Sequence, residues 1–288
     1  MRYVIAVAET RSFTRAAARC YVVQSALSHQ VKALEDELGV RLFARTSRRV
    51  ELTDAGAAFL PAARASIEAA QRAAADAVAT TGEVRGSVTI GMIPTVTAVD
   101  VPGTLAALRR AHPAVRVSLR TGSSDALLSG IRSREVDVAF IGLPEGAPIA
   151  GVDAVELSRE RLVAVLWPGH RLARRRRLRL ADLEDEPFAD FPSGTPGRSQ
   201  SDLAFDAAGV ARSVAYESMG GELIVALVEE RLAVALMPRA IVAARAGVVA
   251  AEVSDGPSRV QYLAWSSFNP GAAASAFVAV VRAHEPAP

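Results

Sequence analysis

The first fifty residues place apolar side chains at the spacing of an α-helix. In residues 24–38 the intervals are 4, 3 and 4, at Leu27, Val31, Leu34 and Leu38. Gly39 follows, and glycine favours the left-handed conformation in which many helices end. Ser12 precedes an earlier alanine-rich run, which is a typical helix start. Two helices with a short joint are typical of a helix-turn-helix.

The other face of residues 24–38 is polar and carries Ser25, Ser28, His29, Lys32 and Glu35. The second helix of a helix-turn-helix can enter the major groove of DNA, where such side chains bond to base edges. We therefore expect groove contacts from the first residue of this helix and from four residues of its polar face: Gln24, Ser25, Ser28, His29 and Lys32.

Residues 40–52 hold two short apolar segments around a polar turn, which predicts a β-hairpin. Alone, the arginines of the turn would favour an ordinary solvated loop. Directly after a helix-turn-helix they favour the wing of a winged helix, which reaches phosphates or a minor groove. We expect contacts with DNA phosphates, or contacts made by the wing, from Ser12, Thr14, Arg45, Arg48 and Arg49.

The N-terminal segment resembles the LysR-type transcriptional regulators. The resemblance runs through residues 12–17, 24–31, 34–45 and 52–56, in the family's order and spacing across about fifty residues. It implies a sequence-specific DNA-binding regulator that is not an enzyme, with an imperfect palindrome as its operator. Family members usually carry several residues before the segment at Met1, so we expect a shortened first helix or another start. Ser25 stands where the family often has proline.

From Asp54 to about Thr80 the pattern predicts one long helix with Thr53 as its N-cap and Pro61 inside it. Apolar positions repeat every three or four residues, as in the seam of a coiled coil. The resemblance implies that this helix joins two DNA-binding domains. We expect dimer contacts from Leu60, Ala63, Ile67, Ala70 and Ala74. The alternative is a helix that lies on its own domain.

From Gly86 onward, short apolar runs alternate with helical patterns. Runs at 87–92, 115–119 and 136–141 predict strands, and the alternation continues to a last helix over 272–283. This order predicts an α/β fold in which helices cover both faces of a parallel sheet.

The same segment resembles the effector-binding domain of the family, which is built like a periplasmic binding protein. Two α/β lobes flank a cleft, and the resemblance implies that the chain crosses between them near 143–149 and 248–253. The expected domains are a winged helix-turn-helix over 1–52, a linker helix and hinge over 53–84, and an effector-binding domain over 85–288. Within the last, lobe 1 takes about 85–143 and 254–288, and lobe 2 about 150–247.

Three loops that follow predicted strands are rich in hydroxyls and glycine: 94–95, 121–124 and 192–196. Ligands bind beyond the carboxyl ends of parallel strands, and helix N-termini favour anions. One such loop is more simply a helix cap, but three at one cleft predict a small anionic or polar effector such as a carboxylate. The resemblance implies contacts from Thr95, Ser123, Ser193, Gly194 and Thr195. Weaker cleft candidates are Phe140, Ser218 and Met219.

Charge supports a division into two functions. Residues 1–52 hold nine basic and five acidic side chains, a net +4 in a chain whose total is +2. This favours nucleic acid as the partner of the N-terminal part. Six arginines lie within residues 171–179. They could form a second nucleic-acid patch, but acidic residues follow at once and favour an exposed loop.

Other chemistry is sparse. A single cysteine, Cys20, excludes an internal disulfide framework and favours a small core residue over a redox sensor. The four histidines lack metal-ligand spacing, and no phosphate loop, nucleophile elbow or dinucleotide fingerprint occurs, so we expect no metal and no cofactor. No apolar run approaches the roughly 18 residues that span a bilayer, which favours a soluble cytoplasmic protein.

The expected partners are double-stranded operator DNA, a small-molecule effector, and further copies of the chain. By resemblance, dimers pair into a tetramer, and an activator would also contact RNA polymerase. Two alternatives stay open. One is a DNA-binding regulator whose cleft is vestigial, and the other is an enzyme that uses the cleft.

Overall fold

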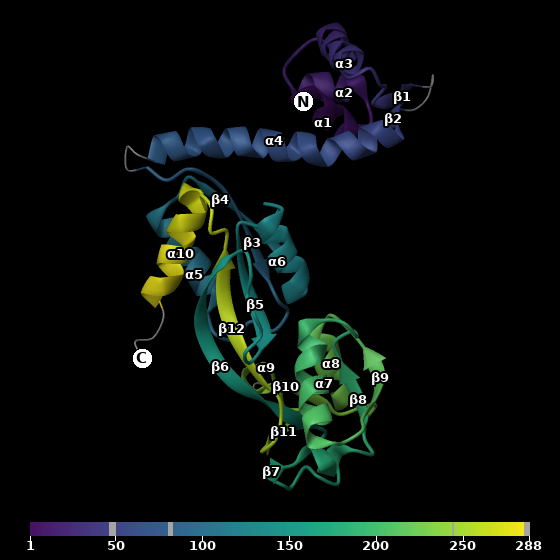
Figure 1. The fold of residues 1–288 in the computed structure, drawn as a ribbon, viewed down its shortest axis with the longest axis vertical. Helices are drawn as coiled ribbons and strands as arrows, with labels where there is room; N and C mark the ends of the chain where they lie inside the picture. The colour runs from purple at the N-terminus through teal and green to yellow at the C-terminus, as the bar shows by residue number, and fades with distance from the viewer. Residues whose placement is uncertain (46–49, 80–82, 244, 285–288) are drawn as a thin grey trace. The chain divides into compact units, whose positions relative to one another are not determined.

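The computed structural model describes residues 1–45, 50–79, 83–243 and 245–284, and the chain forms two compact units (Figure 1). Unit 1 spans Met1–Ala77 and unit 2 spans Val78–Pro288. No helix within the described residues is long and apolar enough to cross a membrane.

Unit 1 opens with three helices: α1 (Arg2–Thr10), α2 (Phe13–Arg19) and α3 (Gln24–Leu38). The Ser12 hydroxyl caps α2 by accepting a hydrogen bond from the Arg15 N–H at 3.3 Å. Gly39 ends α3 with φ of 70°, which confirms the predicted helix and its left-handed cap. Leu27 and Val31 lie in the core of unit 1, which Cys20 also contacts from its edge.

A hairpin follows, formed by β1 (Phe43–Arg45) and antiparallel β2 (Val50–Leu52). Its strands pair Phe43 with Leu52, as a wing requires, and Phe43 packs edge-to-face against Phe13. Two of the expected wing residues, Arg48 and Arg49, lie outside the described residues, and so does most of the expected hinge near Thr81.

The long helix α4 (Asp54–Ala79) begins where the sequence predicts. The Thr53 hydroxyl accepts a hydrogen bond from the Gly56 N–H at 3.0 Å, and Pro61 lies within the helix. The expected seam needs one correction. Ala63 is only 1% exposed inside unit 1, and the adjacent Arg64 pairs with Glu9 of α1 at 3.0 Å. The first half of α4 therefore lies on its own unit, and Ala63 has no surface left for a partner.

Unit 2 contains a long mixed sheet of order β4-β3-β5-β12-β6-β11-β7, with β10 also paired to β6. Its first lobe comprises β3 (Gly86–Met92), α5 (Val101–Ala111), β4 (Val115–Thr121), α6 (Ser124–Arg132), β5 (Val138–Pro144), β12 (Ser258–Trp265) and α10 (Ala272–His284). Here β3, β4 and β5 are parallel, but β12 runs antiparallel to β5. The expectation of a wholly parallel sheet is therefore wrong, because the chain returns from the second lobe in the opposite direction.

The second lobe comprises β7 (Arg177–Leu178), the 3₁₀ helix η1 (Leu180–Leu183), β8 (Pro187–Asp190), α7 (Pro196–Ala208), β9 (Ser213–Glu217), α8 (Gly221–Glu229), β10 (Ala235–Pro238), α9 (Arg239–Val242) and β11 (Val249–Val253). Strands β8 and β9 form a small parallel sheet. The core of this lobe includes Phe188 and Phe205, whose rings meet edge-to-face.

One strand, β6 (Asp153–Leu166), joins the lobes. Residues 153–161 pair with β12 in the first lobe, while 162–166 pair with β10 and β11 in the second. The first crossing therefore lies inside β6 rather than near 143–149, and the second lies between β11 and β12 rather than at 248–253. The first crossing was predicted too early because residues 153–160 mix charged and apolar side chains. This mixture did not indicate that a long strand begins at residue 153.

Helices cover both faces of the first lobe, as the sequence predicts. The residues of β5 alternate between the two faces: Val138 and Phe140 pack in one core cluster with residues of α5 and α10, and Ala139 and Ile141 pack in another with residues of α6. Figure 1 shows these helices around the sheet. Phe140 is therefore a core residue whose ring meets Phe277 edge-to-face. The expectation that it lines the cleft is wrong, because the pleat of β5 turns it away.

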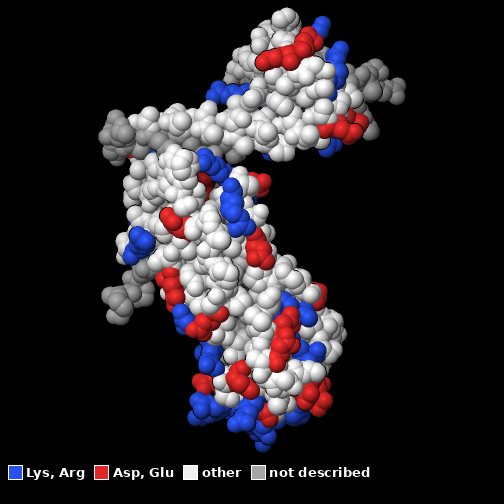
Figure 2. Space-filling model, viewed as in Figure 1, with Lys and Arg blue, Asp and Glu red and all other residues white. Residues whose placement is uncertain are grey.

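The arginine-rich segment 171–179 is exposed in the second lobe. Arg171 pairs with Glu186 at 2.9 Å and Arg175 with Asp182 at 2.8 Å. On the face that Figure 2 shows, basic side chains gather near β7 with acidic ones among them. These contacts support the exposed-loop interpretation of the sequence.

Candidate functional site

The first candidate site is the surface of α3. Its residues Gln24, Ser25, His29 and Lys32 are exposed, and Ser28 is half-buried, while Leu27 and Val31 of the same helix point into the core. Five of the ten expected DNA contacts therefore share one side of one helix. This side presents hydrogen-bond donors and acceptors and one cation to an incoming partner.

The remaining expected contacts are more scattered. Thr14 is exposed on α2, whereas the Ser12 hydroxyl is already committed to capping that helix. Arg45 is the last residue of β1. The Ser12 oxygen already accepts the capping hydrogen bond, so only the hydroxyl proton of Ser12 remains for a phosphate. Ser12 is therefore a weaker candidate than Thr14.

Glu35 corrects the expected polar face of α3. The sequence pattern places it among the exposed residues, yet its carboxylate is 2% exposed. Its Oε1 accepts hydrogen bonds from the backbone N–H groups of Leu42 and Phe43, at 2.8 and 3.1 Å. The chain after Gly39 folds back over this part of the helix, which the local pattern cannot report. Glu35 thus ties α3 to the first strand of the hairpin.

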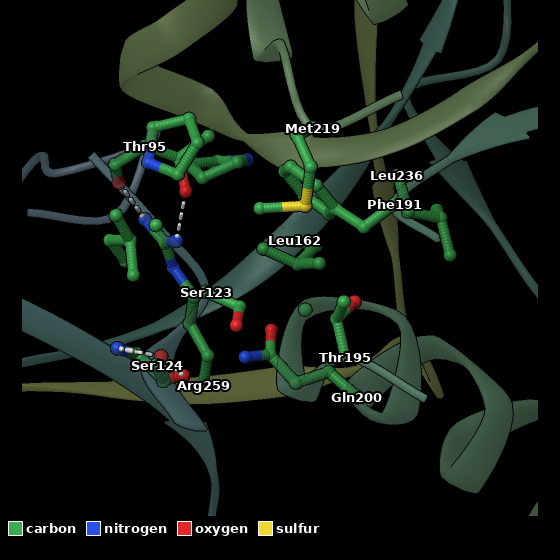
Figure 3. A pocket seen from close by; sticks show the side chains of 16 residues that line it. Thr95, Ser123, Ser124, Leu162, Phe191, Thr195, Gln200, Met219, Leu236 and Arg259 are labelled. Atoms are coloured by element: carbon green, nitrogen blue, oxygen red, sulfur yellow. Dashed lines mark hydrogen bonds between the residues drawn. The ribbon is translucent and has the colours of Figure 1, made fainter. Parts of the chain in front are cut away.

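The second candidate site is a partly open cavity between the two lobes of unit 2 (Figure 3). The centres of water-sized atoms can occupy about 30 Å³ of it. Polar side chains from both lobes line it: Thr95, Ser123, Ser124, Thr195, Gln200 and Arg259. Apolar side chains line the rest, chiefly Leu162, Phe191, Met219 and Leu236. The cavity therefore has a polar part and an apolar part.

Four of the eight expected effector residues reach this cavity: Thr95, Ser123, Thr195 and Met219. Ser193 and Gly194 belong to the turn before α7 but do not line it, and the Ser218 hydroxyl accepts a hydrogen bond from the Gly220 N–H at 3.0 Å. Phe140, as described above, lies in the core. The three loops do converge on the cavity, and Thr95, Ser123 and Thr195 each come from one of them.

Two of the hydroxyls at the cavity, those of Ser123 and Thr195, act as helix caps. Ser123 Oγ accepts from the Ala126 N–H at 3.4 Å at the start of α6, and Thr195 Oγ1 accepts from the Arg198 N–H at 3.3 Å at the start of α7. Two helix N-termini thus face the cavity from opposite lobes. Their partial positive charges favour an electron-rich ligand group.

Arg259 on β12 is a cavity residue that the sequence interpretation missed. Its buried guanidinium donates to Thr95 Oγ1 at 2.7 Å and to Glu160 Oε1 at 2.7 Å. Burial lowers the pKa of Arg259, and the Glu160 carboxylate opposes that change. Glu160 and Arg259 stand next to the two crossings, so the pair joins both strands at the junction of the lobes. The available signal was a charged residue next to the apolar residues of β12.

A second buried pair supports the apolar wall. Arg212 donates to Asp190 Oδ2 at 2.7 Å, and the other oxygen of Asp190 accepts from the Phe191 N–H at 2.7 Å. Burial raises the pKa of Asp190, and Arg212 opposes that change. Asp190 therefore fixes the backbone of Phe191, whose side chain lines the cavity.

No group of three potential metal ligands occurs among the residues that the structure describes. The cavity has hydroxyls, one amide and one cation, but no described nucleophile paired with a base. Its chemistry suits binding of a small molecule by hydrogen bonds and apolar contact.

Comparison with known proteins identifies both units. Residues 1–57 match the bacterial regulatory helix-turn-helix protein, lysR family, and residues 81–286 match the LysR substrate binding domain. A probable hydrogen peroxide-inducible genes activator of Mycobacterium avium is 38% identical over 201 residues, a match that covers 70% of this chain and only 64% of that protein.

Two further relatives extend the comparison. The transcriptional dual regulator GltC of Bacillus subtilis (strain 168) is 31% identical over 238 residues, covering 83% of this chain and 79% of that protein. The crystal structure of full-length CbnR complexed with its target DNA superposes with a TM-score of 0.73 at 26% identity, covering 98% of this chain and 97% of that one. The chain belongs to the LysR family of bacterial regulatory helix-turn-helix proteins.

Proposed function

We propose that this protein is a DNA-binding transcriptional regulator of the LysR type. The observation that carries the proposal is the division of α3, which buries Leu27 and Val31 and exposes Gln24, Ser25, His29 and Lys32. In the proposed complex this side of α3 enters the major groove and the hairpin contacts the backbone. The neighbouring crystal structure of full-length CbnR with its target DNA supports DNA as the partner.

The cavity between the lobes is the proposed effector site. A ligand that binds one arrangement of the lobes more tightly than another would shift the protein toward that arrangement and so alter its action on DNA. Two helix N-termini and Arg259 favour an oxygen-rich group, in line with the carboxylate expected from the loops. Thr95, Ser123, Thr195 and Met219 are its proposed contacts.

The proposed assembly is a dimer through α4, with effector-binding domains pairing dimers into a tetramer. Leu60 and Ile67 are half-buried and Ala70 and Ala74 are exposed, so these four carry the proposed seam without Ala63. The site of action would be the cytoplasm, and an activator would also contact RNA polymerase.

The M. avium relative is named a probable hydrogen peroxide-inducible genes activator. Oxidation of a thiol in the effector-binding domain is not the signal proposed for this chain. The only cysteine is Cys20, which is half-buried beside the core of unit 1. Residues 85–288 contain no thiol to oxidise. Effector sensing here therefore depends on reversible binding in the cavity.

The test is fluorescence anisotropy with labelled DNA from upstream of the protein's own gene, random duplex as competitor, and salt as a variable. We expect binding that survives the competitor. Binding no tighter than to random duplex, also after extension of the N-terminus, would contradict the proposal. Titration of carboxylates by calorimetry separates an effector-controlled regulator from one with a vestigial cleft. Turnover of a bound ligand would favour the enzyme alternative.

A further inference from the structure

Gln200 differs from the other polar side chains of the cavity. It lies in the second turn of α7, is 5% exposed, and points into the cavity (Figure 3). Within the described part of the chain its amide makes no hydrogen bond. The other buried glutamine, Gln261, accepts from the Thr97 N–H at 3.0 Å and donates to Glu160 at 2.8 Å. The amide atoms of Gln200 are open to the cavity, so water or a ligand there can complete their hydrogen bonds.

Most other polar groups of the cavity are already committed. The Thr195 hydroxyl donates to the Pro192 carbonyl at 2.7 Å as well as capping α7. The Ser124 hydroxyl donates to the Gly142 carbonyl at 2.8 Å and accepts from the Gly142 N–H at 3.0 Å. Thr95 accepts from Arg259. These residues shape the cavity and leave little hydrogen-bonding capacity for a ligand.

The uncommitted capacity belongs to four side chains. Gln200 offers two N–H donors and one carbonyl acceptor, and Arg259 offers one N–H of Nη1. Ser123 and Thr95 each offer a hydroxyl proton, because their oxygens only accept. Donors therefore outnumber acceptors, and the single cationic side chain among the described lining residues is Arg259. A carboxylate accepts from such donors, which makes it the favoured head group.

The carbonyl oxygen of Gln200 adds a second requirement, because it needs a donor on the ligand. A hydroxyl beside the carboxylate supplies one. An ammonium group would also donate, but no acidic side chain lines the described cavity, so its charge would be buried without a counter-ion. The apolar wall of Leu162, Phe191, Met219 and Leu236 accommodates a short hydrocarbon body.

We propose that Gln200 is the specificity-determining residue of the cavity and selects a small 2-hydroxycarboxylate with an apolar body. This inference rests on the proposed function, since it takes the cavity as the effector site. Three probes of nearly equal shape separate the alternatives: 2-hydroxyisovalerate, isovalerate, which lacks the hydroxyl, and valine, which replaces it by an ammonium.

The experiment is isothermal titration of the full-length protein with each probe at neutral pH. For the unaltered protein we expect 2-hydroxyisovalerate to bind about tenfold more tightly than isovalerate, the effect of one hydrogen bond, and valine to bind more weakly than both. In Gln200→Leu the preference for the hydroxyl should fall to near unity. In Gln200→Glu both hydroxy acid and simple acid should lose affinity, because like charges meet.

Ser201→Ala is the matched control. Ser201 is the neighbouring buried residue of α7, but it does not line the cavity, so the preference should be unchanged. DNA binding by each variant, measured by anisotropy without probe, establishes that the variant is folded. If Gln200→Leu does not fold, Gln200→Met replaces it.

The two proposals fail differently. Loss of specific DNA binding in the unaltered protein contradicts the proposed function, whatever the probes do. Retained DNA binding with an unchanged hydroxyl preference in Gln200→Leu overturns the role of Gln200. Tighter binding of valine, or no binding of any probe at millimolar concentration, overturns the proposed effector class.

Discussion

The Oε1 atom of Glu35 lies 2.8 Å from the backbone nitrogen of Leu42, and this contact joins α3 to the segment that leads into β1. The same oxygen also accepts from the Phe43 N–H. Because β1 starts at this anchor, the position of β1 relative to α3 depends in part on one buried carboxylate. The proposed groove and backbone contacts can form together only if that relation is kept.

Glu35→Ala should therefore reduce both stability and DNA binding. Two buried N–H groups lose their acceptor, which should lower the free energy of unfolding by about 2–3 kcal/mol. Urea unfolding measures this loss, and anisotropy measures the weaker binding. Glu37→Ala, on the exposed side of the same helix, is the control and should stay within about 0.5 kcal/mol. Equal effects of both substitutions would contradict the anchoring role.

Val23→Ser should stabilise unit 1. Val23 is the N-cap of α3, is 69% exposed, and offers no side-chain oxygen to the free N–H groups of the first turn. A serine can accept from them and should add about 1 kcal/mol. The thermal midpoint and urea unfolding both report the change. Val40→Ser, the same exchange at an exposed position where no helix starts, should give no gain.

Phe140→Ala tests the correction made by the fold. Loss of this buried ring should destabilise the protein by about 3–5 kcal/mol, because it leaves a hole beside Phe277. Met219→Ala removes a partly exposed cavity residue and should cost far less stability while weakening effector binding. Weaker effector binding with unchanged stability in Phe140→Ala would return that residue to the cleft.

Asp182→Asn should change how stability depends on pH. The backbone N–H of Arg179 lowers the pKa of Asp182, and the charge of Arg175 acts in the same direction. A lowered pKa in the folded state means that the ionised carboxylate stabilises the fold above about pH 3.8, its ordinary value, and that this gain disappears as the pH falls through the lowered value. Urea unfolding of both proteins between pH 6 and 2.5 measures it.

The difference in stability between wild type and Asp182→Asn should thus be constant near neutral pH and shrink only below about pH 4. Glu184→Gln, a neighbouring acidic position with no ion pair among the described residues, is the control. A difference that grows on acidification would have the wrong sign and would contradict the stabilising role of the ionised carboxylate.

Arg48→Ala concerns the expected tip of the wing. If Arg48 binds a phosphate, its removal should weaken binding to every DNA sequence and reduce the slope of log affinity against log salt by about one. Anisotropy at four or five salt concentrations gives that slope. An unchanged slope would remove Arg48 from the proposed contacts.

Local elements were predictable because their signals are local. The bounds of α3, the Thr53 cap of α4 and the alternation of strands and helices in unit 2 depend on residues within one or two turns of one another. The errors have the opposite origin. Ala63, Glu35 and Phe140 each have a neighbour distant in sequence that decides whether the side chain is exposed.

The cleft shows the same limit. Its hydroxyl-rich loops are recognisable in the sequence. Thr95, Ser123 and Thr195 could be found there because each follows a predicted strand and precedes a predicted helix. Arg259 and Gln200 could not be assigned to it in this way, since one lies in a strand and the other in a helix, without a motif around either. They lie near these loops only in the folded protein, where β12 of the first lobe and α7 of the second lobe both border the cavity.

The sequence by itself therefore determined the family, the periodic elements and most of the exposed polar side of α3, since periodicity and caps are properties of neighbouring positions. The tertiary structure alone decided which polar groups are buried, where the chain crosses between lobes, and which hydrogen-bonding groups of the cavity remain uncommitted. The physical reason is that burial and hydrogen bonding depend on segments that meet in space but are often more than a hundred residues apart in the sequence. Arg259 and Thr95, which share a hydrogen bond, are separated by 164 positions.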